Sequence, residues 1–179
     1  ISLCDRHFGI GGFGIVLIEK SDIADAGMRI FNRDGSEGKM AGNCIRCAAK
    51  YLYDNGCVSG DSVTIETASG IKKAYLYTSN EKVTLVSVDM GKAGFSAKEL
   101  PSVINADKLI DYPAEIDNTV YNVTCVNVGN PHCVVFCDSI DNIDIETIGP
   151  KFENAPIFPE RINTEFVRAV NSNTLKMRV

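Results

Sequence analysis

The feature that most constrains the fold is a run of three short alternating segments in the first half of the chain. Apolar and polar residues alternate along residues 62–67, 73–78 and 82–89, and turn-forming residues separate the three segments. Alternation with a period of two is typical of strands that bury one face. The sequence therefore predicts a β-meander in this region.

A helix is predicted shortly before this meander. After Gly42 and Asn43, apolar residues recur three and four positions apart, which places them on one helical face. These residues are Ile45, Ala48, Ala49 and Leu52. Asn55 and Gly56 then provide a signal typical of a helix C-terminus.

The order of elements favours two α+β lobes, because strands, turns and a helix are followed by a similar theme. Further strands are expected at residues 15–19, 27–32, 118–128, 133–137, 165–170 and 174–179. We expect lobes at residues 1–96 and 97–179, each incomplete at its outer end, since the chain opens without Met and closes inside a strand. Residues 92–113 are expected to be an irregular linker, and Pro150, Pro156 and Pro159 to mark loops.

The composition excludes several classes of protein. The chain has 179 residues, 45% of them apolar, which is enough for a packed core. Lys and Arg number 18 and Asp and Glu 23, so the formal net charge is −5. This acidic balance disfavours nucleic-acid partners and membrane surfaces. No apolar run is long enough to span a bilayer.

The seven cysteines are predicted to be free thiols. Their number is odd, the first residues show no signal-peptide pattern, and several cysteines lie in apolar segments such as CVVFC at residues 133–137. This usage favours buried thiols in a reducing cytoplasm over a disulfide framework.

Cys44 and Cys47 form a CxxC pair whose role the spacing leaves open. A redox pair, half a metal site, a catalytic thiol with a structural neighbour and two buried small residues are the alternatives. A zinc site needs a second pair of ligands, and the chain has no second CxxC and only two histidines, His7 and His132. We therefore predict no metal site and disfavour the redox interpretation.

Gly42 and Asn43 open the predicted helix and allow two interpretations. The first N–H groups of a helix are unpaired, and glycine lets an anion approach them closely. Alternatively, Asn43 is an ordinary N-cap residue.

The sequence GNPH, residues 129–132, places a turn after a strand. His132 is then expected at a strand end beside the amide of Asn130, an arrangement that suits a polar ligand. A lone histidine is more often structural than catalytic.

Four segments together resemble the diaminopimelate epimerase family. They are LCDRHFGIGGFG, MRIFNRDGSEGKMAGNCIRCAAKYLYDNG, VNVGNPHCVVF and FPERINTEFV, in this order along nearly the whole chain. The resemblance implies two pseudo-symmetric lobes, each a curled β-sheet wrapped around a central helix. It also implies an isomerase that converts LL-diaminopimelate to meso-diaminopimelate by thiol acid/base chemistry, without pyridoxal phosphate or another cofactor.

The resemblance further implies a cytoplasmic enzyme of lysine and peptidoglycan biosynthesis, a small amino-acid substrate and a homodimer. It assigns substrate binding to Asn32, Gly42, Asn43, Asn130 and Asn163. Gly42 and Asn43 are expected to offer backbone N–H groups to the reacting carboxylate, since such groups stabilise developing charge. The three other asparagines are expected to hold the distal end of the substrate. His132 is expected near the reacting centre, and Arg46 and Cys47 to be structural.

One departure from the family pattern concerns the catalytic thiols. The family usually has CGNGIRC where this chain has AGNCIRC, so the first family thiol falls on Ala41, and Cys44 carries a thiol three residues later. The segment with the second family thiol is expected after MRV at residues 177–179. The candidate catalytic residues are Cys44 and His132.

Three hypotheses remain open. Cys44 replaces the lost base, or the enzyme works with one thiol and another base, or the protein binds an amino acid without turning it over. Another amino-acid racemase or isomerase on the same fold is the alternative activity.

Overall fold

The computed structural model describes residues 1–179. The chain divides into two compact units, Ile1–Gly91 and Lys92–Val179. The boundary between the units thus lies between residues 91 and 92, whereas the sequence analysis placed it between residues 96 and 97. Each unit is described by itself below.

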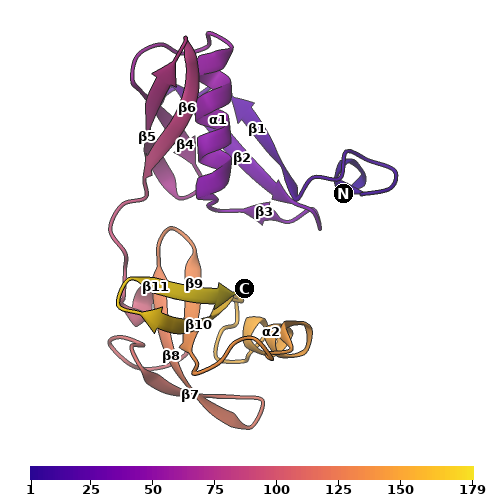
Figure 1. Cartoon of the computed structure of the whole chain (residues 1–179), viewed down its shortest axis with the longest axis vertical. Helices are drawn as coiled ribbons and strands as arrows, with labels where there is room; N and C mark the ends of the chain where they lie inside the picture. Colours follow the sequence, from indigo (N-terminus) through magenta and orange to yellow (C-terminus); the bar gives the residue numbers. More distant parts are fainter. The chain divides into compact units, whose positions relative to one another are not determined.

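The first unit is a sheet with one helix on it (Figure 1). Its elements are η1 (Ser2–Cys4), β1 (Gly14–Glu19), β2 (Ala26–Asn32), β3 (Glu37–Gly38), α1 (Gly42–Asp54), β4 (Ser62–Thr67), β5 (Gly70–Ser79) and β6 (Lys82–Asp89). The strand order is β1-β2-β4-β5-β6, and β3 pairs with β2. The predicted meander is confirmed as β4, β5 and β6, which pair antiparallel.

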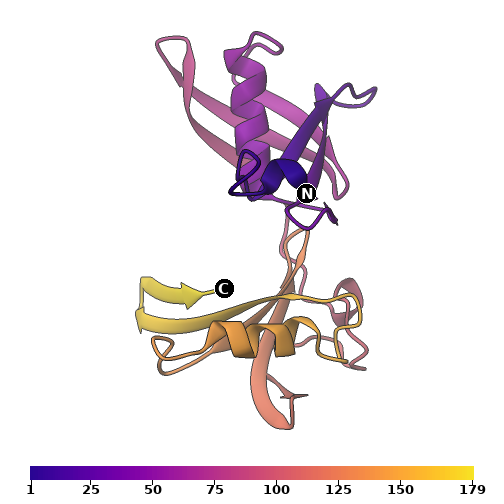
Figure 2. The same cartoon turned by 90° about the vertical axis from the view of Figure 1, so that its right-hand side faces the viewer.

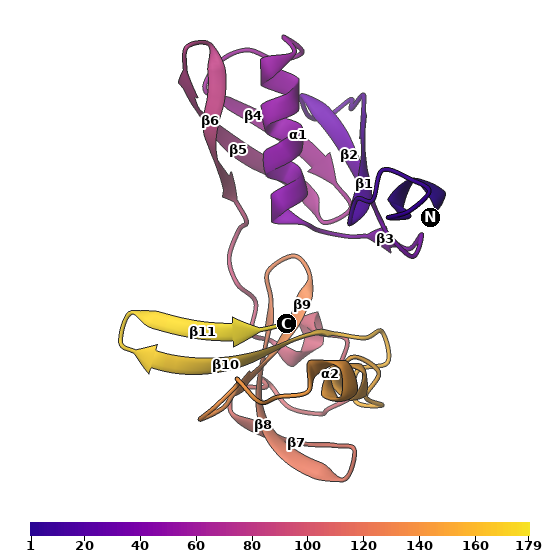
Figure 3. The ribbon, with the colours of Figure 1, turned by 45° about the vertical axis from the view of Figure 1, so that its right-hand side comes forward.

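Helix α1 lies along one face of this sheet, as the view in Figure 3 shows. It buries the four predicted residues Ile45, Ala48, Ala49 and Leu52. The facing strands contribute alternate residues to the same core, among them Met28, Val63 and Ile65. The apolar face of the amphipathic helix thus packs on the apolar face of the sheet, and together these two faces form the core of the first unit.

The second unit holds a five-stranded sheet with the order β11-β10-β9-β8-β7. Its elements are η2 (Ala97–Glu99), β7 (Tyr112–Ile116), β8 (Thr119–Asn127), β9 (Pro131–Phe136), α2 (Ile145–Glu153), β10 (Asn163–Asn171) and β11 (Thr174–Arg178). Strands β9 and β10 are parallel and are connected through α2, whereas the other neighbours are antiparallel. Figure 2 shows α2 beside β10 in this unit.

Phe152 of α2 is fully buried in the core of the second unit. Its ring meets Tyr121 and Phe166 edge to face, with ring centroids 4.9 and 5.2 Å apart. These aromatic contacts attach the helix to the sheet. The expected α+β class with two curled sheets is confirmed. Neither helix has the length and apolar character that crossing a membrane requires.

Two predictions about proline-containing segments differ from the structure. Residues 92–111 are irregular as expected, apart from the short η2, but β7 begins at Tyr112 and includes Pro113. Strand β7 lies at the edge of its sheet, where a residue without an N–H group is tolerated. The region of Pro150 was expected to be a loop, but Pro150 lies inside α2. Asp144 caps that helix by accepting a hydrogen bond from the Thr147 amide, which favours the helix despite the proline.

The cysteines are all free, but they are less buried than predicted. Cys4, Cys125 and Cys133 are buried, Cys44 and Cys137 are half-buried, and Cys47 and Cys57 are exposed. Cys47 is therefore not the buried scaffold residue that was expected. Its position on α1 falls outside the apolar face, which is formed by Ile45, Ala48, Ala49 and Leu52.

Candidate functional site

The start of α1 presents backbone amides that have no helical partner. Ala41 is the N-cap residue, and its side chain makes no capping hydrogen bond. The first helical bond runs from the Ile45 amide to the Ala41 carbonyl, at 3.1 Å. The amides of Gly42, Asn43 and Cys44 precede it and are left unpaired at the positive end of the helix dipole. This geometry suits a carboxylate or another anion.

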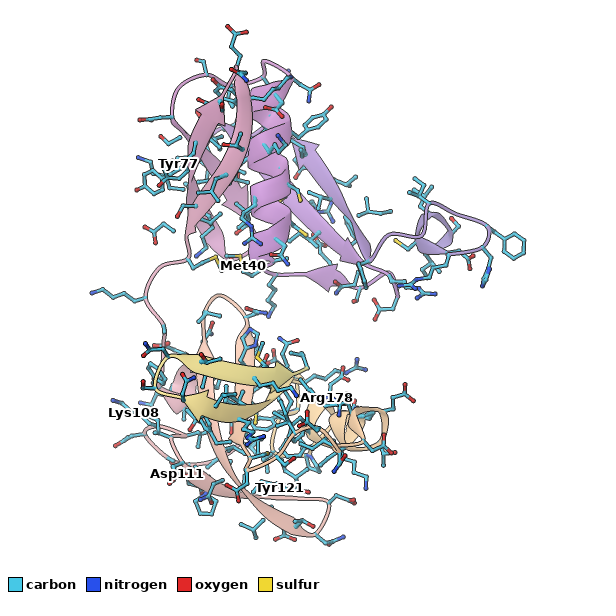
Figure 4. The ribbon with its side chains drawn as sticks, in the orientation of Figure 1. Met40, Tyr77, Lys108, Asp111, Tyr121 and Arg178 are labelled. Carbon is cyan, nitrogen blue, oxygen red and sulfur yellow. The ribbon has the colours of Figure 1, made fainter.

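Asn43 is not the N-cap residue, so that interpretation is wrong. It occupies the second position of α1, and its side-chain oxygen accepts a hydrogen bond from Arg46. Arg46 thus holds the Asn43 side chain along the helix. Met40, labelled in Figure 4, lies at the same end of the unit, where the chain enters α1.

Cys44 is a poor candidate for an activated thiolate. It is half-buried, and its side chain packs against the core of the first unit. Burial raises the pKa of the Cys44 thiol, and the neighbouring Cys47 raises it further. Burial disfavours the charged thiolate, which is the reactive form of a cysteine. Position 41, where the chain turns into the helix, carries only a methyl group.

Asn32 ends strand β2 and is fixed by the turn that follows. Its amide N–H donates to the Ser36 carbonyl at 2.8 Å, and its side-chain Nδ2 donates to Ser36 Oγ at 3.0 Å. The turn passes through Gly35, whose φ of +90° favours glycine. Asn32 is exposed. The turn leads through β3 to the start of α1, so Asn32 and the free amides belong to the same unit.

The second unit brings three predicted site residues together. Asn130 lies in the turn between β8 and β9, and His132 follows it in β9. Asn163 begins β10 and lies directly opposite His132 in the parallel register. The Asn163 side chain donates to the Pro131 carbonyl at 3.0 Å, which ties the two strand starts together. The predicted grouping of GNPH with Asn163 is thus present at one edge of the sheet.

Glu165 is a polar residue at this edge that sequence reasoning missed. Its Oε1 lies 2.6 Å from Nδ1 of His132. Glu165 is 7% exposed and is the one buried carboxylate of the chain. The sequence placed Glu165 in a predicted strand beside Phe166 and Val167, but it gave no signal that this carboxylate is buried against His132.

A cavity of about 340 Å³ lies elsewhere in the second unit. Ile116, Tyr121 and Phe152 contribute to its lining, and Asp117 and Lys151, which form an ion pair at 2.6 Å, also line it. None of the predicted site residues lines this cavity. The predicted site residues therefore form two groups, each within its own unit: Asn32 with the start of α1 in the first unit, and Asn130, His132 and Asn163 in the second.

Solved structures identify the class of fold. A hydroxyproline epimerase from Agrobacterium vitis, solved with bound trans-4-hydroxy-L-proline, matches with a TM-score of 0.66 at 15% identity, over 98% of this chain and 56% of that one. A probable proline racemase from Agrobacterium radiobacter matches with a TM-score of 0.62 at 15% identity, over 92% of this chain and 52% of that one. The fold is therefore that of proline racemase-like and epimerase-like proteins.

Sequence relatives identify the family. The family model described as diaminopimelate epimerase matches residues 1–96 and 124–179. The chain is 44% identical to the diaminopimelate epimerase of Pelotomaculum thermopropionicum, covering 100% of this chain and 64% of the relative. It is 48% identical to that of Acetivibrio thermocellus, covering 98% of this chain and 62% of the relative. The chain belongs to the diaminopimelate epimerase family and spans less than two thirds of the length of these curated relatives.

Proposed function

We propose that the protein is an isomerase that converts LL-diaminopimelate to meso-diaminopimelate without pyridoxal phosphate. The observation that carries this proposal is the identity of 44–48% to two diaminopimelate epimerases along almost the whole chain. The free amides at the start of α1 support it, because they suit the carboxylate of an amino acid. The substrate is a small molecule, and neither nucleic acid nor membrane takes part.

In the first unit, Gly42 and Asn43 bind the carboxylate next to the reacting carbon. Removal of the α-proton moves negative charge onto that carboxylate, and no pyridine ring is available to delocalise it. Preorganised N–H donors stabilise charge that develops in the transition state. Asn32 binds the distal end of the substrate in this proposal.

In the second unit, Asn130 and Asn163 hold the distal amine and carboxylate, and His132 carries a proton. Imidazole is suited to this task because its pKa lies near neutral pH. Epimerisation needs one group to take the α-proton from one face and a second group to return a proton to the other. Cys44 is kept as the second candidate proton carrier, although its raised pKa disfavours it as the base.

The test is exchange of the substrate α-proton in deuterated water, using the protein expressed from its complete gene. We expect LL- and meso-diaminopimelate to exchange and interconvert. His132→Asn should reduce the exchange by about 100-fold or more, as expected on losing a general acid/base. Cys44→Ala compared with Cys44→Ser decides whether that thiol carries a proton. Absence of exchange with both stereoisomers would refute the epimerase proposal.

A second candidate function is favoured by Ala41. Since the family thiol position carries no thiol, the protein could instead bind an amino acid without turning it over, or racemise another amino acid. Calorimetric titration that shows binding of diaminopimelate without exchange would support the non-catalytic homologue. A screen of other amino acids in the same exchange assay would identify a different racemase.

We further propose, from family membership, a cytoplasmic homodimer that serves lysine and peptidoglycan biosynthesis. Light scattering after size-exclusion chromatography tests the dimer. Complementation of a bacterial strain that requires diaminopimelate tests the pathway, with the His132→Asn variant as the negative control.

A further inference from the structure

His132 and Glu165 occupy neighbouring positions on one face of the second sheet. His132 is the second residue of β9, and Glu165 is the third residue of β10. In the parallel register, Asn163 faces His132 and Glu165 faces Val134. Because residues two apart in a strand point to the same face, both side chains lie on the same side of the sheet. The diagonal offset lets Glu165 Oε1 reach His132 Nδ1 at 2.6 Å.

The carboxylate of Glu165 is buried, which costs free energy because little in the structure replaces its contacts with water. Glu165 is 7% exposed, and the contact of its Oε1 with His132 Nδ1 is the one hydrogen bond that its side chain makes. Its second oxygen, Oε2, is buried without any hydrogen-bond partner. A buried polar atom with no partner destabilises a fold and calls for an explanation. A structural clamp between β9 and β10 would not need a charge, since the ladder already joins these strands.

The chemistry of the pair gives the carboxylate a defined effect on the imidazole. With Glu165 ionised, its carboxylate only accepts hydrogen bonds, so Nδ1 of His132 carries the proton and donates it. The Nε2 atom is then the unprotonated nitrogen of the neutral ring, and it has no hydrogen-bond partner in the structure. A carboxylate that holds histidine in one tautomer is the arrangement that orients the general base in serine proteases.

We propose that Glu165 is a positioning residue that holds His132 in the Nδ1–H tautomer, with Nε2 free to exchange a proton. The structural part of this inference stands on the pair alone, and the catalytic part rests on the proposed function. Asn130 and Asn163 lie at the same sheet edge, so the free nitrogen belongs to the group of residues proposed to bind the substrate. Glu165 itself touches no substrate.

The first test reads the tautomer directly and needs no activity. The chain has only two histidines, so long-range proton–nitrogen correlation on histidine-labelled protein resolves both rings, with the exposed His7 as an internal reference. At a pH where the rings are neutral, we expect His132 in the Nδ1–H form. Glu165→Gln keeps an acceptor and should keep that tautomer. Glu165→Leu removes the acceptor and should shift His132 toward the Nε2–H form.

Two outcomes of this test would overturn the proposal. One is an Nε2–H tautomer in the wild type, which would mean that a protonated Glu165 donates to Nδ1. The other is a tautomer that Glu165→Leu leaves unchanged. Loss of folding does not confound the comparison, because amide spectra of both variants report whether the fold is kept.

The second test measures kcat and KM for diaminopimelate in the protein from the complete gene. Glu165→Leu should lower kcat by about 10- to 100-fold, a part of what general acid/base catalysis supplies, with KM little changed. The kcat of Glu165→Gln should lie between the kcat of the wild type and that of Glu165→Leu. An unchanged kcat in Glu165→Leu would overturn the catalytic part. If the wild type is inactive, the proposed function fails, and the tautomer result still decides whether Glu165 positions His132.

Discussion

At the scale of single residues, Ala41 is the most informative position. It is the N-cap of α1, yet alanine is among the poorest residues for that position because it cannot accept a hydrogen bond from the first amides. The amides of the first turn stay available as a result. The chain thus has a less stable helix start together with a ready anion-binding surface.

This lost stability can be restored by one substitution. Ala41→Ser places a hydroxyl acceptor next to the Asn43 and Cys44 amides and should raise the free energy of unfolding by about 0.5–2 kcal/mol. Urea denaturation of the 179-residue chain measures the change. Ala41→Val is the control, because it fits the extended backbone of residue 41 but offers no acceptor. Equal effects of the two substitutions would show that capping is not the cause.

The reactivity of Cys44 should depend on pH in a way that follows from its raised pKa. The raised pKa keeps the Cys44 thiol neutral to a higher pH than a free cysteine. Its thiolate, which is the reactive form, therefore forms at a higher pH. We expect the midpoint of its alkylation by iodoacetamide to lie above the ordinary value of about 8.5. Mass spectrometry of each cysteine measures the rates, with exposed Cys57 as the reference. A midpoint below that of Cys57 would contradict the desolvation of Cys44.

Some features of the candidate site follow from local sequence and others do not, for a physical reason. The unpaired amides at Gly42 and Asn43 could be predicted because every helix start leaves such amides, which is a local property. Glu165 was missed because its burial depends on the register between β9 and β10, which local sequence does not specify. The capping role given to Asn43 failed because α1 begins at Gly42, which makes Ala41 the N-cap residue.

At the scale of elements, the strands with clean alternation were predicted well. The meander and α1 follow from periodicity alone. Strand β7 and helix α2 were missed because Pro113 and Pro150 indicate breaks, and tertiary context overrides that signal. Pro113 lies in an edge strand, and α2 is supported by the Asp144 cap and by the burial of Phe152.

The attachment of α2 to its sheet should depend on Phe152. This ring is fully buried and packs edge to face on Tyr121 and Phe166. Phe152→Ala should destabilise the chain by about 3–5 kcal/mol, the usual cost of removing a core aromatic ring. Phe136→Ala is the matched control in the same unit, because Phe136 is 61% exposed. Chemical denaturation compares the two, and a similar loss in both would contradict the assigned core.

At the scale of the whole molecule, the chain consists of two units with separate cores. One core contains the apolar face of α1, and the other contains Phe152, Phe158 and Phe166. Each unit supplies one group of candidate site residues. Lys92 begins the second unit and is exposed, whereas Gly94 soon afterwards is fixed to Asn127 by two backbone hydrogen bonds of 2.8 Å.

This division predicts the site of limited proteolysis. Brief treatment with trypsin should cut after Lys92, because this exposed residue lies at the boundary between the two units, and should leave two fragments. Mass spectrometry identifies the cut. Lys92→Gln should abolish it, whereas Lys73→Gln, in strand β5, should not change it. Earlier cleavage within β5 or β6 would contradict two stable cores.

The parallel pairing of β9 with β10 has a consequence for the order of folding. The β8–β9 and β10–β11 hairpins close between neighbouring residues, whereas β10 can pair with β9 only after the crossover through α2 has been closed. Such long-range closure costs chain entropy. The contact between His132 and Glu165 should therefore form late. In stopped-flow refolding followed by pulsed hydrogen exchange, the β10 amides that bond to β9 should gain protection after the amides of β8. The proposed proton carrier then acquires its orientation only when the second unit is complete.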